Sequence, residues 1–150
     1  MKLATALTER AEVQRKINEL ETRLRNNAKV QDGERPSEEP SDLLNELNGA
    51  LDRLEELMSR INLTNSRTEK NGITMTELLS RRDVLKKRVS VMRSFLDAAS
   101  SRVDRYSKTE IKVLSTVDVA DLQKKVDAAS KKLRETDEII QELNWTTELL

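Results

Sequence analysis

The sequence predicts an all-α protein, an antiparallel up-down four-helix bundle of long helices, with a short extended, β-like appendage in the connector between helices three and four. Charged residues make up 36% of the 150 residues and aromatic residues only 2%, a composition typical of long helices and coiled coils. Apolar residues recur with heptad spacing over four stretches, and three Gly and two Pro residues leave few breaks. The length fits a single domain, residues 1–150.

The first helix is expected at about residues 2–31. Mostly apolar residues recur every seven positions in two series that form one face. The series are Leu3, Arg10, Ile17 and Leu24, and Ala6, Val13, Leu20 and Asn27. Pro36 and the acidic side chains around it predict that the helix ends there and that residues 32–37 form an acidic loop.

The second helix is expected at about residues 38–70, with Ser37 or Ser41 as its cap and Pro40 in its first turn. An Asn71-Gly72 pair after it predicts a tight turn. The seam that we expect to face the bundle interior consists of Leu44, Leu47, Leu51, Leu54, Met58 and Ile61, followed by the polar residues Asn65 and Thr68.

The third helix is expected at about residues 75–105, opened by a capping box of Thr74 and Glu77. The fourth is expected at about residues 118–149, with Asp118 as its cap. The expected seam of the third is Met75, Leu78, Arg82, Leu85, Val89, Met92, Leu96, Ala99 and Val103. That of the fourth is Val119, Leu122, Val126, Ala129, Leu133, Thr136, Ile140, Leu143, Thr147 and Leu150.

The extended connector, residues 106–117, departs from the helical pattern. Its β-branched residues Ile111 and Val113 alternate with charged neighbours, which favours a strand. We expect this segment to pair with residues 30–33 or with the same stretch of another subunit. The candidate assembly residues are therefore Tyr106, Glu110, Ile111 and Val113.

Net charge alternates along the expected helices. Residues 1–31 carry a net charge of +3, residues 41–70 of −2, residues 75–105 of +4 and residues 118–150 of −3. Helices that follow one another are thus complementary, and like charges meet only across the diagonal of a bundle, where screening weakens them. This pattern supports the up-down order.

Composition excludes several functions. The chain has no Cys and no His, so it lacks the ligands of zinc and di-iron sites and a thiolate nucleophile, and we expect no metal and no cofactor. No phosphate-cradling loop or nucleophile elbow occurs, so we expect no enzyme. Balanced charge argues against nucleic acid as a partner. No apolar run approaches the roughly 20 residues of a membrane span, which disfavours a membrane partner and predicts a cytoplasmic protein.

A polar cluster is expected at one bundle end. Arg82 and Asn65 take seam positions where an apolar residue would pack better, and Asn144 and Trp145 lie at the same end. Two interpretations are open for these four residues. They form either a small polar pocket for a ligand of unknown identity, or a hydrated bundle end or subunit contact that fixes register. The second is favoured.

Five stretches carry a family resemblance. They are NNAKVQDGE at residues 26–34, RINLTNS at 60–66, RRDVLKKRVSV at 81–91, DRYSKTEIKVLSTVDVADLQ at 104–123 and IQELNWTTEL at 140–149. With them the chain resembles the septicolysin-like family of small, uncharacterised bacterial helical proteins. The resemblance implies no catalytic or ligand-binding residues, but the family name implies a haemolysin or pore-forming protein.

The function that we expect from the sequence is that of a non-enzymatic, self-associating structural or interaction protein, a homodimer or larger homo-oligomer. A thin bundle with few large side chains buries little area per residue, so self-association would add stability. The alternatives are a cytolysin-like membrane-active protein and a small-ligand-binding helical bundle.

Overall fold

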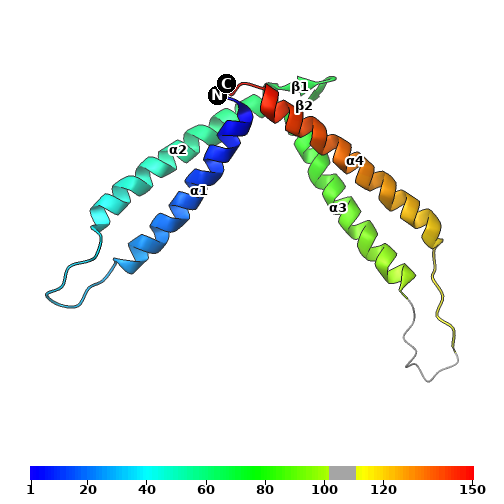
Figure 1. Ribbon diagram of the computed structural model, residues 1–150, viewed down its shortest axis with the longest axis horizontal. Coiled ribbons are helices and arrows are strands. Elements are labelled where there is room, and N and C mark those ends of the chain that lie inside the picture. The colour runs from blue at the N-terminus through cyan, green and yellow to red at the C-terminus, as the bar shows by residue number, and fades with distance from the viewer. Residues whose placement is uncertain (102–110) are drawn as a thin grey trace. The chain divides into compact units, whose positions relative to one another are not determined.

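The computed structural model of the chain describes residues 1–101 and 111–150. In chain order its elements are α1 (Leu3–Asn26), α2 (Pro40–Arg67), β1 (Glu69–Lys70), β2 (Ile73–Thr74), α3 (Met75–Ser100) and α4 (Val119–Thr146) (Figure 1). The all-α class is therefore confirmed.

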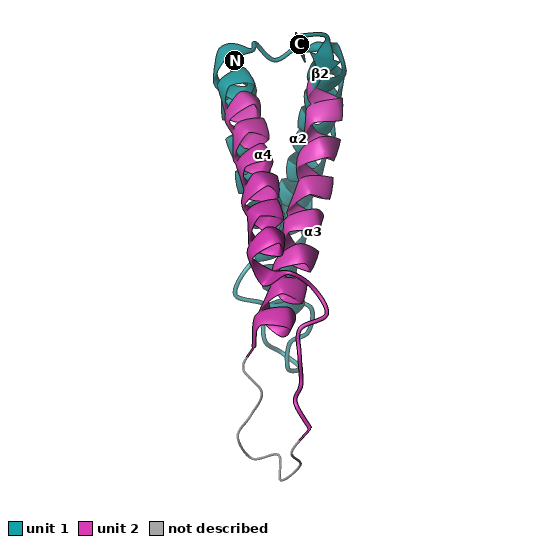
Figure 2. Cartoon of the chain, turned by 90° about the vertical axis from the view of Figure 1, so that its right-hand side faces the viewer, with its two compact units in different colours: residues 1–74, 142–150 teal, residues 75–141 magenta. Residues whose placement is uncertain are grey.

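The chain divides into two compact units. The first contains Met1–Thr74 and Glu142–Leu150, and the second contains Met75–Gln141 (Figure 2). The division falls inside α4, whose last turns belong to the first unit. The single-domain organisation of residues 1–150 stays a prediction.

The first unit is an antiparallel hairpin of α1 and α2 (Figure 1). Leu20, Leu43 and Ala50 form the buried cluster between these helices. The partly buried side chains that pack against the cluster are Val13, Ile17, Leu24 and Leu47. The apolar face predicted for the first helix is confirmed, since Leu3 and Ala6 are buried as well.

Both helices of this hairpin are shorter than predicted. The contacts of Asn27 explain where α1 ends and where the loop before α2 is held. Its side-chain amide donates a hydrogen bond to the Arg23 carbonyl (2.8 Å), and its Oδ1 accepts one from the Glu38 N–H (3.0 Å). Asn27 thus ends α1 and ties the following loop to the residues just before α2. Pro40 occupies the first turn of α2 as predicted, but the cap residue is Glu39, so the predicted Ser caps are wrong.

The Asn71-Gly72 turn is confirmed, and it connects a β-hairpin that the sequence reading missed. Asn71 has φ 54° and Gly72 φ 76°, the left-handed pair that a two-residue hairpin turn requires. The hairpin pairs Glu69 with Thr74 and Lys70 with Ile73.

The chain termini lie side by side in the first unit (Figure 1). The Leu149 N–H donates to the Met1 carbonyl (2.8 Å), and the Leu3 N–H donates to the Thr147 carbonyl (2.9 Å). The Leu150 N–H donates to Thr64 Oγ1 at 3.0 Å, so the C-terminal residues also contact the end of α2.

The second unit is an antiparallel hairpin of α3 and α4 (Figures 1 and 2). Asp118 caps α4 as predicted, because its Oδ1 accepts a hydrogen bond from the Asp121 N–H (3.1 Å). The predicted seams are confirmed by the buried residues Met75, Leu78, Val89, Leu96, Val126, Ala129, Thr136 and Ile140. Val103 of the third seam lies outside the described residues.

The connector differs from its prediction where the structure describes it. Residues 111–117 and residues 30–33 both lie outside the strands of the described chain, so the ribbon predicted between them is not formed by these residues. Ile111 and Val113 are exposed. Tyr106 and Glu110 lie outside the described residues, and the assembly role of the segment stays a prediction.

Candidate interaction surface

Helix α2 carries two apolar faces, and α1 covers only one of them. The residues that the structure buries are Leu43, Ala50, Leu57, Ile61 and Thr64. The predicted interior seam is instead largely at the surface, where Leu44, Leu51 and Met58 are 48%, 43% and 44% exposed. The two series differ by one residue and so lie about 100° apart around a helix of 3.6 residues per turn.

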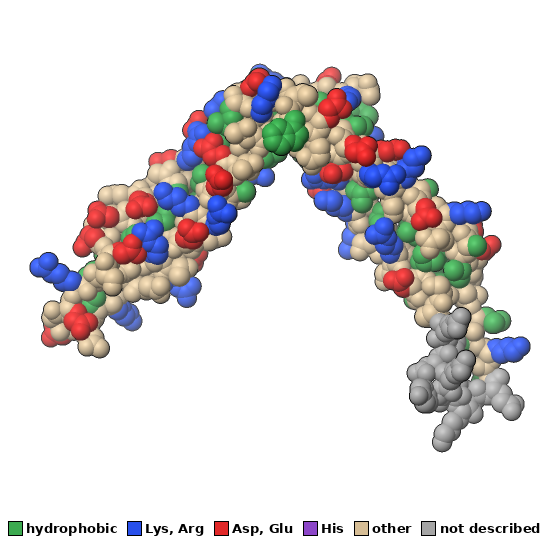
Figure 3. Space-filling model, viewed as in Figure 1, with side chains coloured by type: hydrophobic (Ala, Val, Ile, Leu, Met, Phe, Trp, Pro, Cys, Tyr) green, Lys and Arg blue, Asp and Glu red, His purple; other side chains and the backbone are tan. Residues whose placement is uncertain are grey.

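We refer to Leu44, Leu51 and Met58 as the α2 stripe. The half-buried Leu47 and Leu54 lie between this stripe and the buried face. The predicted interior position was wrong in the single chain for Leu44, Leu51 and Met58, whereas Ile61 is buried and Leu47 packs against the buried cluster. Green hydrophobic side chains reach the surface of both units among charged ones (Figure 3). A row of leucines at heptad spacing on an exposed helix face is the pattern of a coiled-coil seam.

Ion pairs connect α2 to α1 beside the buried cluster. Arg53 of α2 donates to both oxygens of Glu9 in α1, at 2.7 and 3.0 Å, and pairs with Glu56 at 2.6 Å. The hydrogen bond from Arg53 holds the pKa of Glu9 below its ordinary value. Because these contacts commit one side of the helix to α1, the α2 stripe is left on the other side.

A second pair ties the ends of α1 and the loop. Arg23 Nε donates to both carboxylate oxygens of Glu38, at 3.1 and 3.0 Å. This hydrogen bonding lowers the pKa of Glu38 and raises the pKa of Arg23. The Arg53–Glu9 pair lies near the start of α1, and the Arg23–Glu38 pair lies near its end. We call these two pairs the clamps of the first hairpin.

Helix α3 has an exposed apolar series of its own. Val84, Val91 and Phe95 are 62%, 55% and 46% exposed, and their spacings of seven and four residues place them on one face. We call these residues, with Arg88 and Ala98 on the same face, the α3 stripe. One apolar seam was assigned to α3 from the sequence, and the structure buries that seam. A second apolar series on the same helix was not considered, so the α3 stripe was missed.

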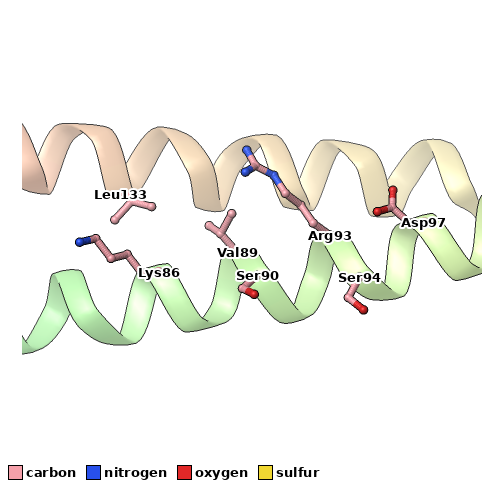
Figure 4. Close-up of a pocket in the computed structure, with 7 residues that line it drawn as sticks. All are labelled: Lys86, Val89, Ser90, Arg93, Ser94, Asp97 and Leu133. Atoms are coloured by element: carbon pink, nitrogen blue, oxygen red, sulfur yellow. The ribbon is translucent and has the colours of Figure 1, made fainter.

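Open grooves run along the α3/α4 hairpin. One is lined by Val89 and Leu133 on its apolar side, with Arg93 reaching toward α4 (Figure 4). Arg93 donates to Ser130 Oγ at 3.3 Å. The other lining side chains are Lys86, Ser90, Ser94 and Asp97. With two apolar side chains in seven, this groove suits contact with another polar surface better than enclosure of an apolar ligand.

The predicted polar cluster is distributed over both units. Asn65 and Asn144 are half-buried and Trp145 is 67% exposed, all in the first unit. Arg82 belongs to the second unit, where its Nη1 donates to Asp137 Oδ1 at 3.4 Å. Its Nε is buried and lacks a hydrogen-bond partner among the described residues. A site that joins all four residues stays a prediction.

Together these features define an all-α protein of helical hairpins that carry exposed apolar helix faces. The chain belongs to the family of unknown function DUF6847, whose model matches residues 10–149. The crystal structure of a functionally unknown conserved protein from Corynebacterium diphtheriae is similar to it, with 45% sequence identity and a TM-score of 0.92. The match covers 100% of this chain and 99% of that chain. No curated protein matches.

The family match corrects the resemblance drawn from the sequence. The chain was taken as septicolysin-like, but the family that it matches has no such name and no known function, so that identification is wrong. The cytolysin-like alternative depended on the name and loses its motivation. None of the helices in residues 1–101 and 111–150 is both long and apolar enough to cross a membrane.

Proposed function

We propose that the protein is a non-enzymatic structural or interaction protein of the cytoplasm that works as a homo-oligomer. The observation that carries the proposal is the exposed α2 stripe. Leu44, Leu51 and Met58 recur every seven residues on a helix whose other apolar face is already packed. Exposed apolar rows of this kind are costly in water and are typical of interaction surfaces.

The predicted four-helix arrangement is, in this proposal, a feature of the assembly. A hairpin of two helices has one packed side, and a second hairpin laid on the α2 stripe would complete an antiparallel bundle with coiled-coil seams. Balanced charge and the absence of Cys and His from the sequence support a role without catalysis or nucleic-acid binding. The same composition supports the cytoplasmic location.

Light scattering of the purified protein at tens of micromolar tests the proposal. The expected mass is a multiple of the 17.2 kDa chain. Leu51→Glu should reduce the mass toward a single chain, because it places a charge in the middle of the stripe. Leu51 is already partly exposed, so the helices should stay folded, which circular dichroism checks.

Asn45→Glu is the matched control, since it adds the same charge to an exposed position of α2 outside the stripe. It should leave the mass unchanged. A single-chain mass for the unmodified protein at these concentrations would overturn the proposal. If both variants have the same mass as the unmodified oligomer, the α2 stripe is not the surface through which the chains associate.

A small-ligand-binding bundle is the other function from a different class. It rests on Arg82, Asn65, Asn144 and Trp145 acting together. No contact among the described residues favours it over self-association, and Trp fluorescence across a set of metabolites is its direct measurement.

A further inference from the structure

The sequence contains two Asn-Gly pairs, and the structure places them in different backbone conformations. Asn48-Gly49 lies inside α2, and Asn71-Gly72 forms the turn of the β-hairpin. We propose that Asn71 is a site of spontaneous covalent modification, at which the side-chain amide is lost and an aspartyl or isoaspartyl residue is formed. Asn48, which precedes a glycine as well, is protected by its helix.

The reaction needs only the chain and water. The backbone nitrogen of Gly72 gives up its proton to the solvent and attacks Cγ of Asn71. The bond from Cγ to the side-chain nitrogen breaks, and this nitrogen takes up a proton and leaves as ammonia. Water then opens the resulting cyclic imide at one of its two carbonyl carbons. Opening at the side-chain carbonyl gives aspartate, whereas opening at the backbone carbonyl gives isoaspartate, in which the main chain continues through Cγ.

The hairpin turn leaves both reacting groups accessible. The hydrogen bond that closes a two-residue hairpin turn joins the flanking residues, here the paired Lys70 and Ile73, so the Gly72 N–H has no place in the ladder. Among the described residues, neither the Gly72 N–H nor the Asn71 side chain has a hydrogen-bond partner. Both residues are exposed, and a Cβ added at Gly72 would meet nothing within 4 Å.

The attack requires a rotation of the Asn71–Gly72 peptide, and the turn permits it. With φ 54° at Asn71 and 76° at Gly72, the turn is of type I′. Rotation of this peptide to a type II′ turn brings ψ of the first residue to about −120°, where the next backbone nitrogen lies on the same side as Cβ. Glycine allows either sign of φ and both turn types fit a hairpin, so the flanking strand pairs are kept.

Asn48-Gly49 lacks this freedom, although it is equally open to water. Both residues are exposed, and a Cβ added at Gly49 would meet nothing within 4 Å. Inside α2, however, the Gly49 N–H is bonded to the carbonyl four residues before it. Rotation of the Asn48–Gly49 peptide would break this hydrogen bond, so the attack requires local opening of α2. Backbone conformation therefore separates the two pairs, and exposure does not.

The modification would change the contacts around the β-hairpin. Lys70 forms an ion pair with Glu142 of α4. Aspartate at position 71 adds a negative charge beside this pair. Isoaspartate adds a carbon atom to the main chain of the turn, so the left-handed pair of residues that closes the hairpin is lost.

Ageing of the purified protein tests the proposal. The folded protein is incubated at mildly alkaline pH, which favours loss of the Gly72 N–H proton, and both asparagines are followed by digestion and peptide mass spectrometry. Asn71 should lose its amide about tenfold faster than Asn48, because attack at Gly49 first requires the loss of a helical hydrogen bond. A methyltransferase specific for isoaspartyl residues should label the aged protein at position 71.

The same incubation in guanidinium chloride is the matched control. Unfolding makes the two backbones alike, so both amides should be lost, and any difference that remains comes from the neighbouring residues and is divided out of the folded-state ratio. Equal rates in the folded protein, or faster loss at Asn48, would overturn the proposal. Retention of both amides in the folded protein while the unfolded protein reacts would overturn it as well, since the turn would then hold its peptide in the type I′ form.

Discussion

The two helical hairpins are held together in different ways. Between α1 and α2, Arg53 pairs with Glu9 at 2.7 Å and Lys16 with Glu46 at 3.7 Å, and Arg23 pairs with Glu38 in the loop. Between α3 and α4, the described polar contacts are the ion pair of Arg82 with Asp137 (3.4 Å) and the hydrogen bond from Arg93 to Ser130 Oγ (3.3 Å).

This difference shows that polar contacts and apolar packing contribute differently to the two hairpins. In the first hairpin the ion pairs and the buried cluster both join α2 to α1, and the α2 stripe lies outside these contacts. The second hairpin relies on its apolar seam and keeps open grooves beside it. The first hairpin thus combines a buried cluster with cross-helix ion pairs, and the second combines a buried seam with the Arg82–Asp137 pair and open grooves.

Truncation of one core leucine in each hairpin should have the largest effect. Leu20 in α1 is fully buried, whereas Leu96 in α3 keeps 8% exposure. We expect Leu20→Ala to lower the free energy of unfolding by about 2–5 kcal/mol, the usual cost at a buried leucine. Leu96→Ala should cost less, because water already reaches that side chain.

Urea denaturation followed by circular dichroism, at one protein concentration, measures both losses. A loss in Leu96→Ala equal to or greater than that in Leu20→Ala would show that the second hairpin is packed as tightly as the first.

Gly49 offers a smaller change of the opposite sign. It is exposed inside α2, and a Cβ added there would meet nothing within 4 Å. Gly49→Ala should therefore raise the free energy of unfolding by roughly 0.5–1 kcal/mol through helix propensity. The position lies off both apolar faces, so the mass by light scattering should not change.

The control for this variant is Gly72→Ala. Gly72 has φ +76°, where a Cβ is strained, so this substitution should destabilise the protein. A stabilising Gly72→Ala would show that the turn relaxes easily, and a destabilising Gly49→Ala would mean that the outer side of α2 is also packed.

The clamps of the first hairpin should give the smallest effect, seen in the pH dependence. The hydrogen bond from Arg53 lowers the pKa of Glu9 from its ordinary 4.5. A lowered folded-state pKa stabilises the fold fully above the unfolded value, and this stabilisation is lost as the pH falls through the folded value. The melting temperature should therefore drop more steeply below about pH 4.5 in the unmodified protein than in Glu9→Gln.

Glu12→Gln, at an exposed position of the same helix, serves as the control and should follow the unmodified curve. Identical acid profiles for all three proteins would mean that the Arg53–Glu9 pair contributes nothing measurable, as many surface pairs do.

Much of the local structure could be predicted because the signals are local. The Asn71-Gly72 turn, the Asp118 cap and Pro40 in the first turn of α2 each depend on a few neighbouring residues. The end of α1 was missed because Asn27 acts through Glu38, eleven residues away. The choice between the two faces of α2 could not be made either, since Leu43 and Leu44 are equally apolar and only the position of α1 decides between them.

The candidate surface was thus present in the sequence but assigned to the wrong side. Leu44, Leu51 and Met58 form a good seam, and heptad spacing predicts burial without saying whether the covering helix comes from the same chain. On α3, Val84 and Val91 are seven residues apart and were the available signal for a second face. Two apolar series on one helix indicate two partners.

The continuity of α4 across the two units has a consequence for cooperativity. Because the division falls within a helix, the backbone hydrogen bonds around Gln141 and Glu142 belong to both units at once. Helix formation is cooperative, so opening the second hairpin would fray the turn that carries Glu142 and its ion pair with Lys70. Unfolding free energy is therefore shared along one helix, and a change that strengthens either hairpin should also protect the other.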